Sequence, residues 1–433
     1  MNMLKTIIIT DAKADASKLR KSGISISDEL IQNVSSIMND VIEHGDAAIL
    51  DYTEKLEGVR LNSLQVTTEE FEHAFSMVTK KQIQAVNVIK SRLIRNEAAV
   101  MKRFKGTTLS SDGVKIHRLV KAIPSVGCYI PSGKAKYAST MIMCAIPAKV
   151  AGVKRIVGIS PPLRDGTVDP LTLVTARICG VKEFYKIGGV QGITALAYGT
   201  STIEKVSKIV GPGGMFVTVA KFLASRKTSI DMVAGPTELL VYGDSKSDPR
   251  LIALDLISQA EHSYDTFCGL VTASKKLARR VSLEIDSILK MNSISHANIV
   301  RKSLEHNGFI AISKDQSTAI KFVNEIAPEH LQLVCRNAHV ISKRITSSGL
   351  VLIGKYTPSS ASDYCFGSNH ILPTLGFARS RGSLSVLDFL KLVTTIESTK
   401  SGLKKLQDSI REITYAEGLI NHYLAVQERI ISK

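Results

Sequence analysis

The chain of 433 residues contains no tryptophan, and aromatic residues make up only 5% of it. The core must therefore be aliphatic, built on Ile, Val, Leu and Ala side chains. Apolar residues account for 44% and charged residues for 22% of the sequence, which are globular proportions that argue against a fibrous or disordered chain. At about 150 residues per domain, this length predicts two or three compact units.

The sequence also lacks long hydrophobic runs. Its most apolar region, residues 140–159, is interrupted by Lys149, Lys154 and Arg155, whereas a membrane helix needs about 18 uncharged apolar residues. Residues 1–10 are too short an apolar stretch for a secretory signal, which needs about 7–15 such residues. We therefore expect a soluble, cytoplasmic protein with no membrane partner.

Closely spaced cysteine pairs are absent as well. No two of the cysteines stand in a C-x-x-C spacing, and scattered cysteines in a long chain are not typical of a disulfide framework. We expect six reduced and mostly buried thiols, at Cys128, Cys144, Cys179, Cys268, Cys335 and Cys365.

Basic residues outnumber acidic ones, with 56 Lys and Arg against 39 Asp and Glu and a net charge of +17. Such a charge raises nucleic acid, a membrane surface or an anionic ligand as partners. The excess is spread out, however, and the sequence shows no run of five like charges, no zinc-finger spacing and no RNA-binding aromatic pattern. We therefore predict no nucleic-acid partner, and two interpretations stay open: a solvated basic surface or a field that attracts an anionic cofactor.

From about residue 113 the chain alternates short β-branched runs with helical stretches, which predicts parallel sheets covered by helices. The expected strands are Val114–Val120, Arg155–Ile159, Phe184–Ile187, Val206–Val210, Glu238–Tyr242, Thr266–Thr272, Phe309–Ile312 and Leu350–Ile353. The expected helices are Asp28–Tyr52, Glu69–Ala99, Pro249–His262, Lys275–Met291, Thr318–Ile326 and the stretch from Gly402 to the end.

Two glycine-rich turns follow expected strands and open expected helices. They are Gly188-Gly189-Val190-Gln191-Gly192 and Gly211-Pro212-Gly213-Gly214. In open α/β sheets ligands bind at the carboxyl ends of strands, where such turns lie. Neither turn has the G-x-G-x-x-G spacing of a dinucleotide fingerprint, so ordinary connections remain an alternative at this point.

Four further groups of polar residues could carry chemistry. Gln259 and His262 are three residues apart and share one helix face. They could be ligands of one metal ion, or they could form a polar patch at the end of a helix. Glu329 and His330 follow Pro328 and could divide acid and base roles, or simply mark a helix terminus. Asp363 lies in a serine-rich loop, where it could also be a turn residue.

The fourth group is Glu417 and His422 near the C-terminus. On a continuous helix these two side chains would diverge by about 140°. They could meet one ligand only if Glu417 precedes the helix, which Gly418 makes plausible.

The order of these motifs along the chain resembles the histidinol dehydrogenase family. The motifs are Gly127-Cys-Tyr129-Ile-Pro-Ser-Gly133, Ser139–Lys149, Gly188-Gly-Val-Gln191, Gly211-Pro-Gly-Gly214, Ile230–Glu238, Ser258-Gln-Ala-Glu-His262, Ala327-Pro-Glu-His330, Asn369-His370-Ile-Leu-Pro373-Thr and Glu417-Gly-Leu419. The resemblance covers essentially the whole chain and is densest over residues 124–424.

The resemblance implies an α/β fold of two incomplete Rossmann-like domains, with parallel sheets flanked by helices and small helical N- and C-terminal extensions. We place an N-terminal arm at residues 1–23 and a larger α/β domain at 24–127 and 238–384. An inserted NAD-binding domain follows at 128–237, and a C-terminal extension at 385–433 reaches the partner subunit of a homodimer.

The resemblance also implies an activity, the oxidation of L-histidinol to L-histidine through L-histidinaldehyde. The reaction uses one zinc ion and two NAD⁺, as the last step of histidine biosynthesis. It places the catalytic acid–base pair on Glu329 and His330, and the metal ligands on Gln259, His262, Asp363 and His422. Substrate contacts fall on Thr237, Gln259, His262, His330, Asp363, Glu417 and His422. NAD contacts fall on Tyr129, Gln191 and Gly214, although the family usually has Asn where Gly214 stands.

Two other functions compete with this one. A zinc hydrolase could use Glu329 as its base, but it would not need glycine-rich cofactor turns. A basic binding protein on a relic enzyme scaffold would not need an intact acid–base pair or intact metal ligands.

Overall fold

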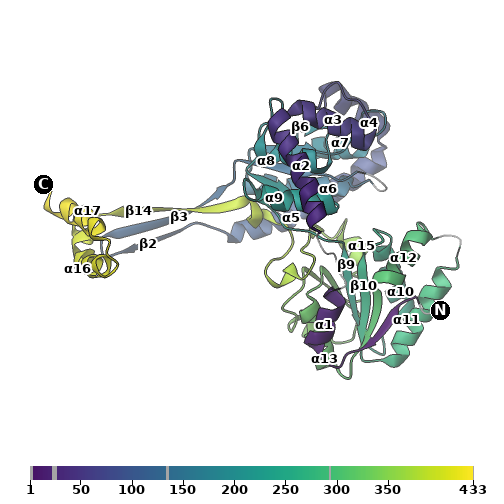
Figure 1. Ribbon diagram of the computed structural model, residues 1–433. Coiled ribbons are helices and arrows are strands. Elements are labelled where there is room, and N and C mark those ends of the chain that lie inside the picture. Colours follow the sequence, from purple (N-terminus) through teal and green to yellow (C-terminus); the bar gives the residue numbers. More distant parts are fainter. Residues whose placement is uncertain (1–2, 22–26, 133–135, 292–293, 433) are drawn as a thin grey trace.

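The computed structural model describes residues 3–21, 27–132, 136–291 and 294–432. Gly133, the last residue of the first family motif, lies outside these ranges, as does the expected boundary between residues 23 and 24. Two parallel sheets form two lobes. A third, antiparallel sheet extends away from the lobes as an arm (Figure 1). Within the described residues, no helix combines the length and the apolar character needed to cross a membrane.

The first lobe is built on a six-stranded parallel sheet in the order β1-β11-β10-β9-β12-β13. The central strand β9 is buried along its whole length, as expected for a strand covered on both faces. The strands are β1 (Lys5–Ile8), β9 (Glu238–Gly243), β10 (Phe267–Thr272), β11 (Gly308–Ile312), β12 (His330–Leu333) and β13 (Leu350–Ile353).

Helices cover both faces of this sheet. One core cluster packs the sheet against α10 (Pro249–Ala260), α11 (Lys275–Ile288) and α12 (Ala297–Asn307). The other packs it against α1 (Ala12–Lys21), α13 (Gln316–Ile326) and α14 (Ala338–Ser342). The N-terminal segment therefore supplies an edge strand and a covering helix to this lobe.

The second lobe contains a five-stranded parallel sheet in the order β6-β5-β4-β7-β8. Its strands are β4 (Ser125–Tyr129), β5 (Arg155–Ile159), β6 (Glu183–Tyr185), β7 (Lys208–Val210) and β8 (Ser229–Ile230). The connecting helices are α6 (Ala138–Ala151), α7 (Pro170–Cys179), α8 (Gly189–Tyr198) and α9 (Met215–Ala224).

The helices near the N-terminus pack on this second lobe. One core cluster joins α4 (Thr68–Met77) and α5 (Lys80–Arg103) to α6 and α7, and another joins α2 (Asp28–His44) and α3 (Asp46–Glu57) to α8 and α9. We expected residues 24–127 to fold with residues 238–384. The domain boundaries stay a prediction, but this packing favours grouping residues 28–103 with the five-stranded sheet.

The arm consists of β2 (Thr107–Ser111), β3 (Val114–Ala122) and β14 (Leu390–Ser398), followed by α16 (Lys400–Ala416) and α17 (Ile420–Ile431). Strand β3 pairs antiparallel with both neighbours. The arm projects from the lobes and carries the two helices at its far end (Figure 1). Gly113 and Gly402 meet where α16 begins, since a Cβ on Gly113 would lie 2.9 Å from the Gly402 Cα.

The arm corrects two sequence-based expectations. Val114–Val120 does form a strand, but it belongs to the antiparallel arm sheet and not to a parallel one. The C-terminal extension, expected to be helical, contains the nine-residue strand β14 before its two helices. The expected helices Asp28–Tyr52 and Glu69–Ala99 are each divided in two, the first of them at Gly45.

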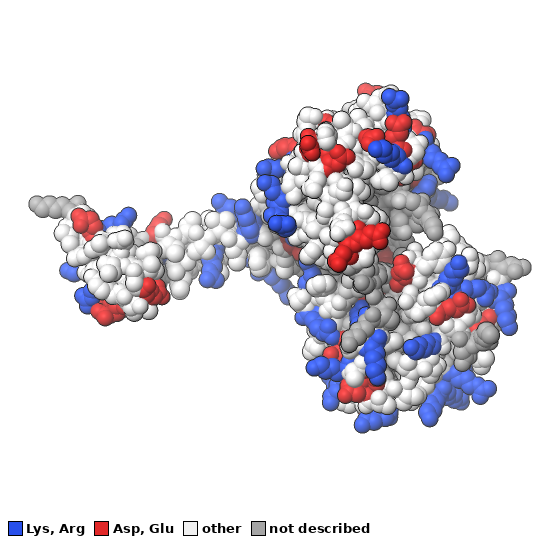
Figure 2. Space-filling view, viewed as in Figure 1, with Lys and Arg blue, Asp and Glu red and all other residues white. Residues whose placement is uncertain are grey.

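The six cysteines are all free, and only Cys365 is exposed, as expected. Basic side chains are scattered over both lobes and the arm on the face shown in Figure 2, with acidic side chains between them. On this face the net charge therefore forms no continuous basic strip.

Candidate active site

A cavity with a volume of about 200 Å³ lies between the two lobes. The second lobe contributes Gly211 and Asp231, which follow β7 and β8. The first lobe contributes Thr237 and Glu329, which precede β9 and β12. The carboxyl edge of one sheet thus faces the amino edge of the other across this cavity. The general expectation of a site at carboxyl ends therefore holds for only one of the two sheets.

The acid–base pair owes its position to the end of α13. Ala327 ends that helix in a left-handed conformation, with φ +48°, and Pro328 cannot continue it. The chain turns there and enters β12 at His330, so that Glu329 and His330 stand at the amino edge of the sheet. Both residues are buried, with 6% and 2% of their surface exposed.

His330 lies between polar groups on both sides. Its Nδ1 is 3.1 Å from the carbonyl oxygen of Glu238, and its Nε2 is 3.3 Å from Asp363 Oδ1. Burial alone would lower the pKa of His330, but the charges of Glu329 and Asp363 outweigh burial and raise this pKa to about 10. In the chain without bound ligands the imidazole therefore favours its protonated form.

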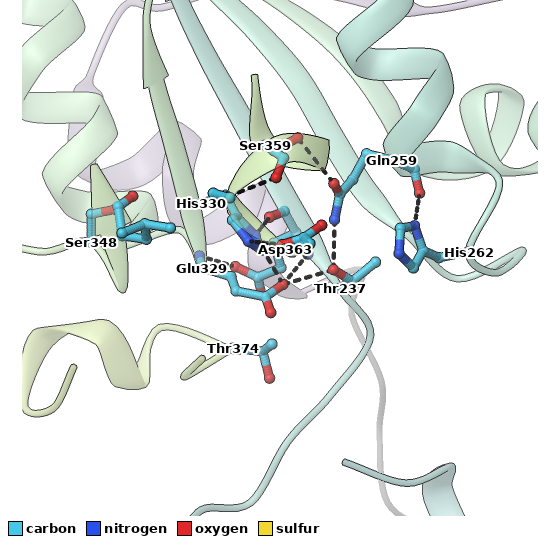
Figure 3. A network of polar contacts seen from close by, with 12 residues as sticks. Thr237, Gln259, His262, Glu329, His330, Ser348, Ser359, Asp363 and Thr374 are labelled. Carbon is cyan, nitrogen blue, oxygen red and sulfur yellow. Dashed lines mark hydrogen bonds and ion pairs between the residues drawn. The ribbon is translucent and has the colours of Figure 1, made fainter. Parts of the chain in front are cut away.

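Glu329 receives its hydrogen bonds at one carboxylate oxygen. The Thr237 hydroxyl donates to Oε2 at 2.9 Å, and the backbone N–H of Glu238 donates to the same atom at 2.6 Å. Gln259 Nε2 lies 2.6 Å from the Thr237 hydroxyl oxygen. Figure 3 shows these side chains converging beside His330 and Asp363. The predicted substrate contact Thr237 thus links helix α10 to the acid–base pair.

Asp363 ends the short helix α15 (Ser359–Ser362). Burial alone would raise the pKa of this carboxyl group, but His330, through its hydrogen bond and its charge, lowers it. The backbone carbonyl of Asp363 is 2.8 Å from Nδ1 of half-buried His370, which also lines the cavity. Burial lowers the pKa of His370.

Three of the four predicted metal ligands gather at this site. Gln259 and His262 come from the last turn of α10 and the residues after it, and Asp363 comes from α15. His262 Nδ1 lies 3.1 Å from the Gln259 carbonyl, so its Nε2 is left for a ligand. The Nε2 of Gln259 bonds to the Thr237 hydroxyl. Its Oε1 accepts a hydrogen bond of 3.5 Å from the Ser359 hydroxyl.

This donor set of amide oxygen, imidazole nitrogen and carboxylate oxygen fits zinc in kind, with glutamine as its least common member. Within the described part of the chain, no three His, Cys, Asp or Glu side chains are placed to hold a metal ion. Of the three donors in the lobe, only His262 and Asp363 are among those residue types, since Gln259 contributes an amide. A four-coordinate zinc ion would therefore need a further ligand from elsewhere.

The fourth predicted ligand lies on the arm. His422 is exposed in the first turn of α17, and exposed Glu417 ends α16, with Gly418 between the helices at φ +73°. The structure therefore confirms that Glu417 precedes the helix that carries His422. It does not bring either residue to the cavity of its own chain, from which the arm projects (Figure 1).

Two of the predicted NAD contacts lie together in the second lobe. Tyr129 ends β4, and its hydroxyl oxygen accepts a hydrogen bond from the Gly189 N–H at 3.4 Å. Burial raises the pKa of Tyr129 to about 12. Gln191 is fully buried, and neither its amide nitrogen nor its amide oxygen has a partner. A buried amide without partners is costly, so this one is available to a ligand at the turn.

The third predicted NAD contact, Gly214, is exposed at the start of α9 and lines a neighbouring cavity of about 300 Å³. The preceding turn requires glycine at Gly211, where a Cβ would come 2.2 Å from the Tyr129 carbonyl oxygen. Lys221 and Asp231, both buried, hold this turn through the Gly211 carbonyl and N–H at 2.8 Å each.

Sequence reasoning missed several residues of the site. Glu238 and His370 stood in recognised motifs without a role, although each contacts the acid–base pair or Asp363. Their presence in those motifs was the only signal. Lys221 gave none, because a lysine within an amphipathic helix normally faces solvent.

Comparison with known proteins supports the same resemblance over the whole chain. The family model described as histidinol dehydrogenase matches residues 20–430. The histidinol dehydrogenase of Methanocaldococcus jannaschii is 39% identical, over 93% of this chain and 93% of that protein. That of Clostridium acetobutylicum is also 39% identical, over 98% of each. The crystal structure of histidinol dehydrogenase from Elizabethkingia anophelis, 33% identical, superposes with a TM-score of 0.94 and covers 100% of this chain and 99% of that one.

Proposed function

This chain belongs to the histidinol dehydrogenase family of NAD-dependent oxidoreductases in histidine biosynthesis, and from this premise we propose how its residues divide the work. The overall reaction converts L-histidinol to L-histidine in two oxidations, through L-histidinaldehyde. NAD⁺ supplies the hydride acceptor in each of them. The observation that carries the proposal is the convergence of Glu329, His330, His262 and Asp363 at one cavity between the lobes, with Gln259 bonded to Thr237 in its wall.

His330 acts as the base of the first oxidation. Its Nδ1 faces the Glu238 carbonyl, so its Nε2 is the nitrogen directed toward Asp363 and the cavity. A metal ion held by Asp363 would offset the carboxylate charge that raises the pKa of His330, so that Nε2 can lose its own proton. The neutral nitrogen then takes the proton of the substrate alcohol as the carbon loses a hydride. Glu329 acts in the second oxidation, where its carboxylate removes a proton from the water that attacks the aldehyde carbon.

Gln259, His262 and Asp363 would hold zinc together with His422 of a second copy of the chain. Zinc bound there would attract the imidazole and amino nitrogens of histidinol and so orient the substrate. Thr237 positions Glu329 through its hydroxyl and contacts the substrate from the same side. Glu417 of the second copy binds the positively charged end of histidinol.

The second lobe would bind NAD⁺ at the carboxyl ends of its strands. The unpartnered amide of Gln191 and the hydroxyl of Tyr129 both lie at the Gly188–Gly189 turn. Gly214 offers a backbone N–H at the start of α9, where the helix dipole favours anionic groups. The surplus of basic residues would assist the capture of this anionic cofactor.

The homodimer is supported by the chemistry of the arm. Its helices bury only Gly402, Thr414 and Tyr423, yet expose large apolar side chains. Exposed fractions range from 40% at Leu406 to 64% at Ile431. An apolar surface of this kind is typical of an interface, and a second copy that covers it would receive Glu417 and His422 into its own site.

A coupled assay with metal analysis tests the proposal. We expect NADH to appear when histidinol and NAD⁺ are added, with two NADH formed per histidinol, and to stop when zinc is chelated. His330→Asn should reduce this rate severely while the zinc content stays unchanged. Absence of NADH from zinc-loaded protein would refute the activity, and loss of zinc from His330→Asn would refute the assigned role.

A further inference from the structure

Glu238 is a buried residue that contacts both members of the acid–base pair. It begins strand β9 and exposes only 1% of its surface. Its backbone N–H donates to Glu329 Oε2 at 2.6 Å, and its carbonyl oxygen is 3.1 Å from His330 Nδ1. In return, the backbone N–H of Glu329 donates to Glu238 Oε2 at 3.2 Å. Each glutamate thus binds the main chain of the other.

A buried carboxylate needs compensation, and Arg20 provides it. The guanidinium reaches both carboxylate oxygens of Glu238, with Nη2 at 2.9 Å from Oε2 and Nη1 in contact with Oε1. The backbone N–H of Leu375 adds a hydrogen bond of 2.8 Å to Oε1. Both oxygens of Glu238 are therefore satisfied by charge-assisted or backbone donors.

Arg20 also holds the turn that leads into the acid–base pair. Its Nε donates to the Ile326 carbonyl at 3.1 Å, and its Nη2 donates to the Ala327 carbonyl at 3.2 Å. Ala327 is a non-glycine residue at φ +48°, a strained conformation that persists only where its surroundings hold it. The guanidinium further lies 5.2 Å from the centre of the Phe267 ring.

We propose that Arg20 and Glu238 are positioning residues that fix the two catalytic side chains at the amino edge of the sheet. Glu238 sets Glu329 through reciprocal main-chain contacts and sets the ring of His330 through its carbonyl. Arg20, on helix α1, neutralises Glu238 and fastens the turn before Glu329. The N-terminal helix therefore acts on the chemistry without touching the substrate. This inference rests on the proposed roles of Glu329 and His330.

The test compares Arg20→Met with Arg155→Met in the zinc-loaded full-length enzyme. Arg155 is a matched control, because it pairs with Glu183 at 2.6 Å and also donates to two backbone carbonyls, but in the second lobe. We expect Arg20→Met to lower kcat by about tenfold to a hundredfold. The KM for histidinol and the zinc content should stay within about twofold. Arg155→Met should leave kcat within the same twofold range.

Conservative variants separate positioning from folding. Arg20→Lys can restore one of the two bonds to Glu238 and should recover part of the lost kcat. Glu238→Gln keeps the size of the side chain but presents an amide donor toward a backbone N–H, so it should lower kcat as Arg20→Met does. If Arg20→Met fails to fold, these two variants carry the test. Unchanged kcat per zinc-loaded site in both would overturn the inference.

A double-mutant cycle separates this inference from the proposed function. If Arg20 acts through His330, then adding Arg20→Met to His330→Asn should lower kcat by less than it does in the native background. Full additivity of the two losses would overturn the positioning role. A native kcat in His330→Asn itself would instead overturn the proposed function.

Discussion

The lobes and the arm of this protein differ in how their functional residues are held. In the cavity between the lobes, Glu329, His330 and Asp363 each have hydrogen-bond partners within the same chain. On the arm, Glu417 and His422 are exposed beside exposed apolar side chains. The lobes thus form a prearranged reaction centre, whereas the arm carries groups whose surroundings must come from another molecule.

The difference indicates a division between chemistry and assembly. Helix α16 carries Leu403, Leu406, Ile410 and Ile413 at spacings of three and four residues, which place them along one face. No core cluster within the described residues includes them. Under the proposed function, the lobes lack one ligand of the zinc ion and the arm lacks a partner surface, so a second copy of the chain would supply both.

The strongest test of this comparison mixes two inactive variants. His330→Asn disables the lobes, and His422→Ala disables the arm. Each homodimer should be nearly inactive. If the arm serves the partner, random exchange of subunits should restore about a quarter of the sites, since half of the dimers are mixed and each has one intact site. The rate of NADH formation per total subunit measures this recovery.

The control for subunit mixing is the same exchange between two variants of the lobes, His330→Asn and Glu329→Gln. In that mixture both sites of every mixed dimer carry one altered lobe residue. It should therefore recover no activity. An arm that serves its own chain would give no recovery in the first mixture either, which would contradict the proposed exchange.

A weaker perturbation targets the apolar face of the arm without touching a predicted ligand. Replacing Leu406 and Ile413, which are 40% and 56% exposed, by Asp should weaken the dimer by about a hundredfold. Activity should fall at the same protein concentrations at which the dimer dissociates. Sedimentation and NADH formation, measured over a dilution series, would show this coincidence.

Leu283→Asp is the matched control in the lobes, because Leu283 is 58% exposed on α11. We expect it to change neither the dimer nor the rate. An equal loss of dimer in this variant would mean that exposure alone, and not the arm, determines assembly.

The sequence predicted the lobes better than the arm, for a physical reason. Strand β9 is buried on both faces and therefore stands out as an apolar run. Strand β2, with the sequence TTLSS, is exposed at every position, and β14 is largely exposed. Strand β14 pairs with β3, which is distant in the chain, whereas β2 pairs with β3 across the short turn at Asp112 and Gly113. Because both strands are exposed, no buried hydrophobic pattern marked them.

The same contrast applies within the site. Glu329 and His330 are adjacent, and Gln259 and His262 share a helix face, so local spacing indicated both pairs. The contact between Arg20 and Glu238 joins residues 218 positions apart, and neither residue has a local pattern that points to the other. The placement of the acid–base pair at the amino edge also depends on how the lobes face each other, which spacing does not specify.

A half-buried carboxyl group in the lobes should respond to pH in a way that no arm residue does. Burial raises the pKa of Asp255 from 3.8 to about 6, while a hydrogen bond of 2.8 Å from Gln332 partly opposes this. At pH 7 the Asp255 carboxyl group is ionised in both the folded and the unfolded protein, and burial of its charge destabilises the folded state. Below pH 6 the folded state binds the proton first, so this penalty disappears.

Asp255→Asn should therefore raise the free energy of unfolding at pH 7 by about 2 kcal/mol. The new amide can also donate to Gln332 Oε1, which is buried without a partner. The gain should shrink as the pH falls from 7 toward 4, as measured by denaturant unfolding at each pH. Asp408→Asn on the arm is the control, since Asp408 is 84% exposed and should shift stability by less than about 0.5 kcal/mol. A gain from Asp255→Asn that is independent of pH would contradict the assigned cause.

The smallest expected effect concerns Gly214, where the cofactor side of the lobes departs from the family pattern. Its backbone has φ −64° and ψ 179°, which any residue adopts, and no atom lies within 4 Å of a Cβ built there. Gly214→Asn should therefore fold normally and add an amide that lowers the KM for NAD⁺ by about fivefold. Gly214→Ala adds the Cβ without the amide and should leave this KM unchanged. Because Gly214 belongs to the lobes, neither variant should alter the dimer or the zinc content. Equal KM values for NAD⁺ in the two variants would show that the missing amide is not what limits cofactor binding.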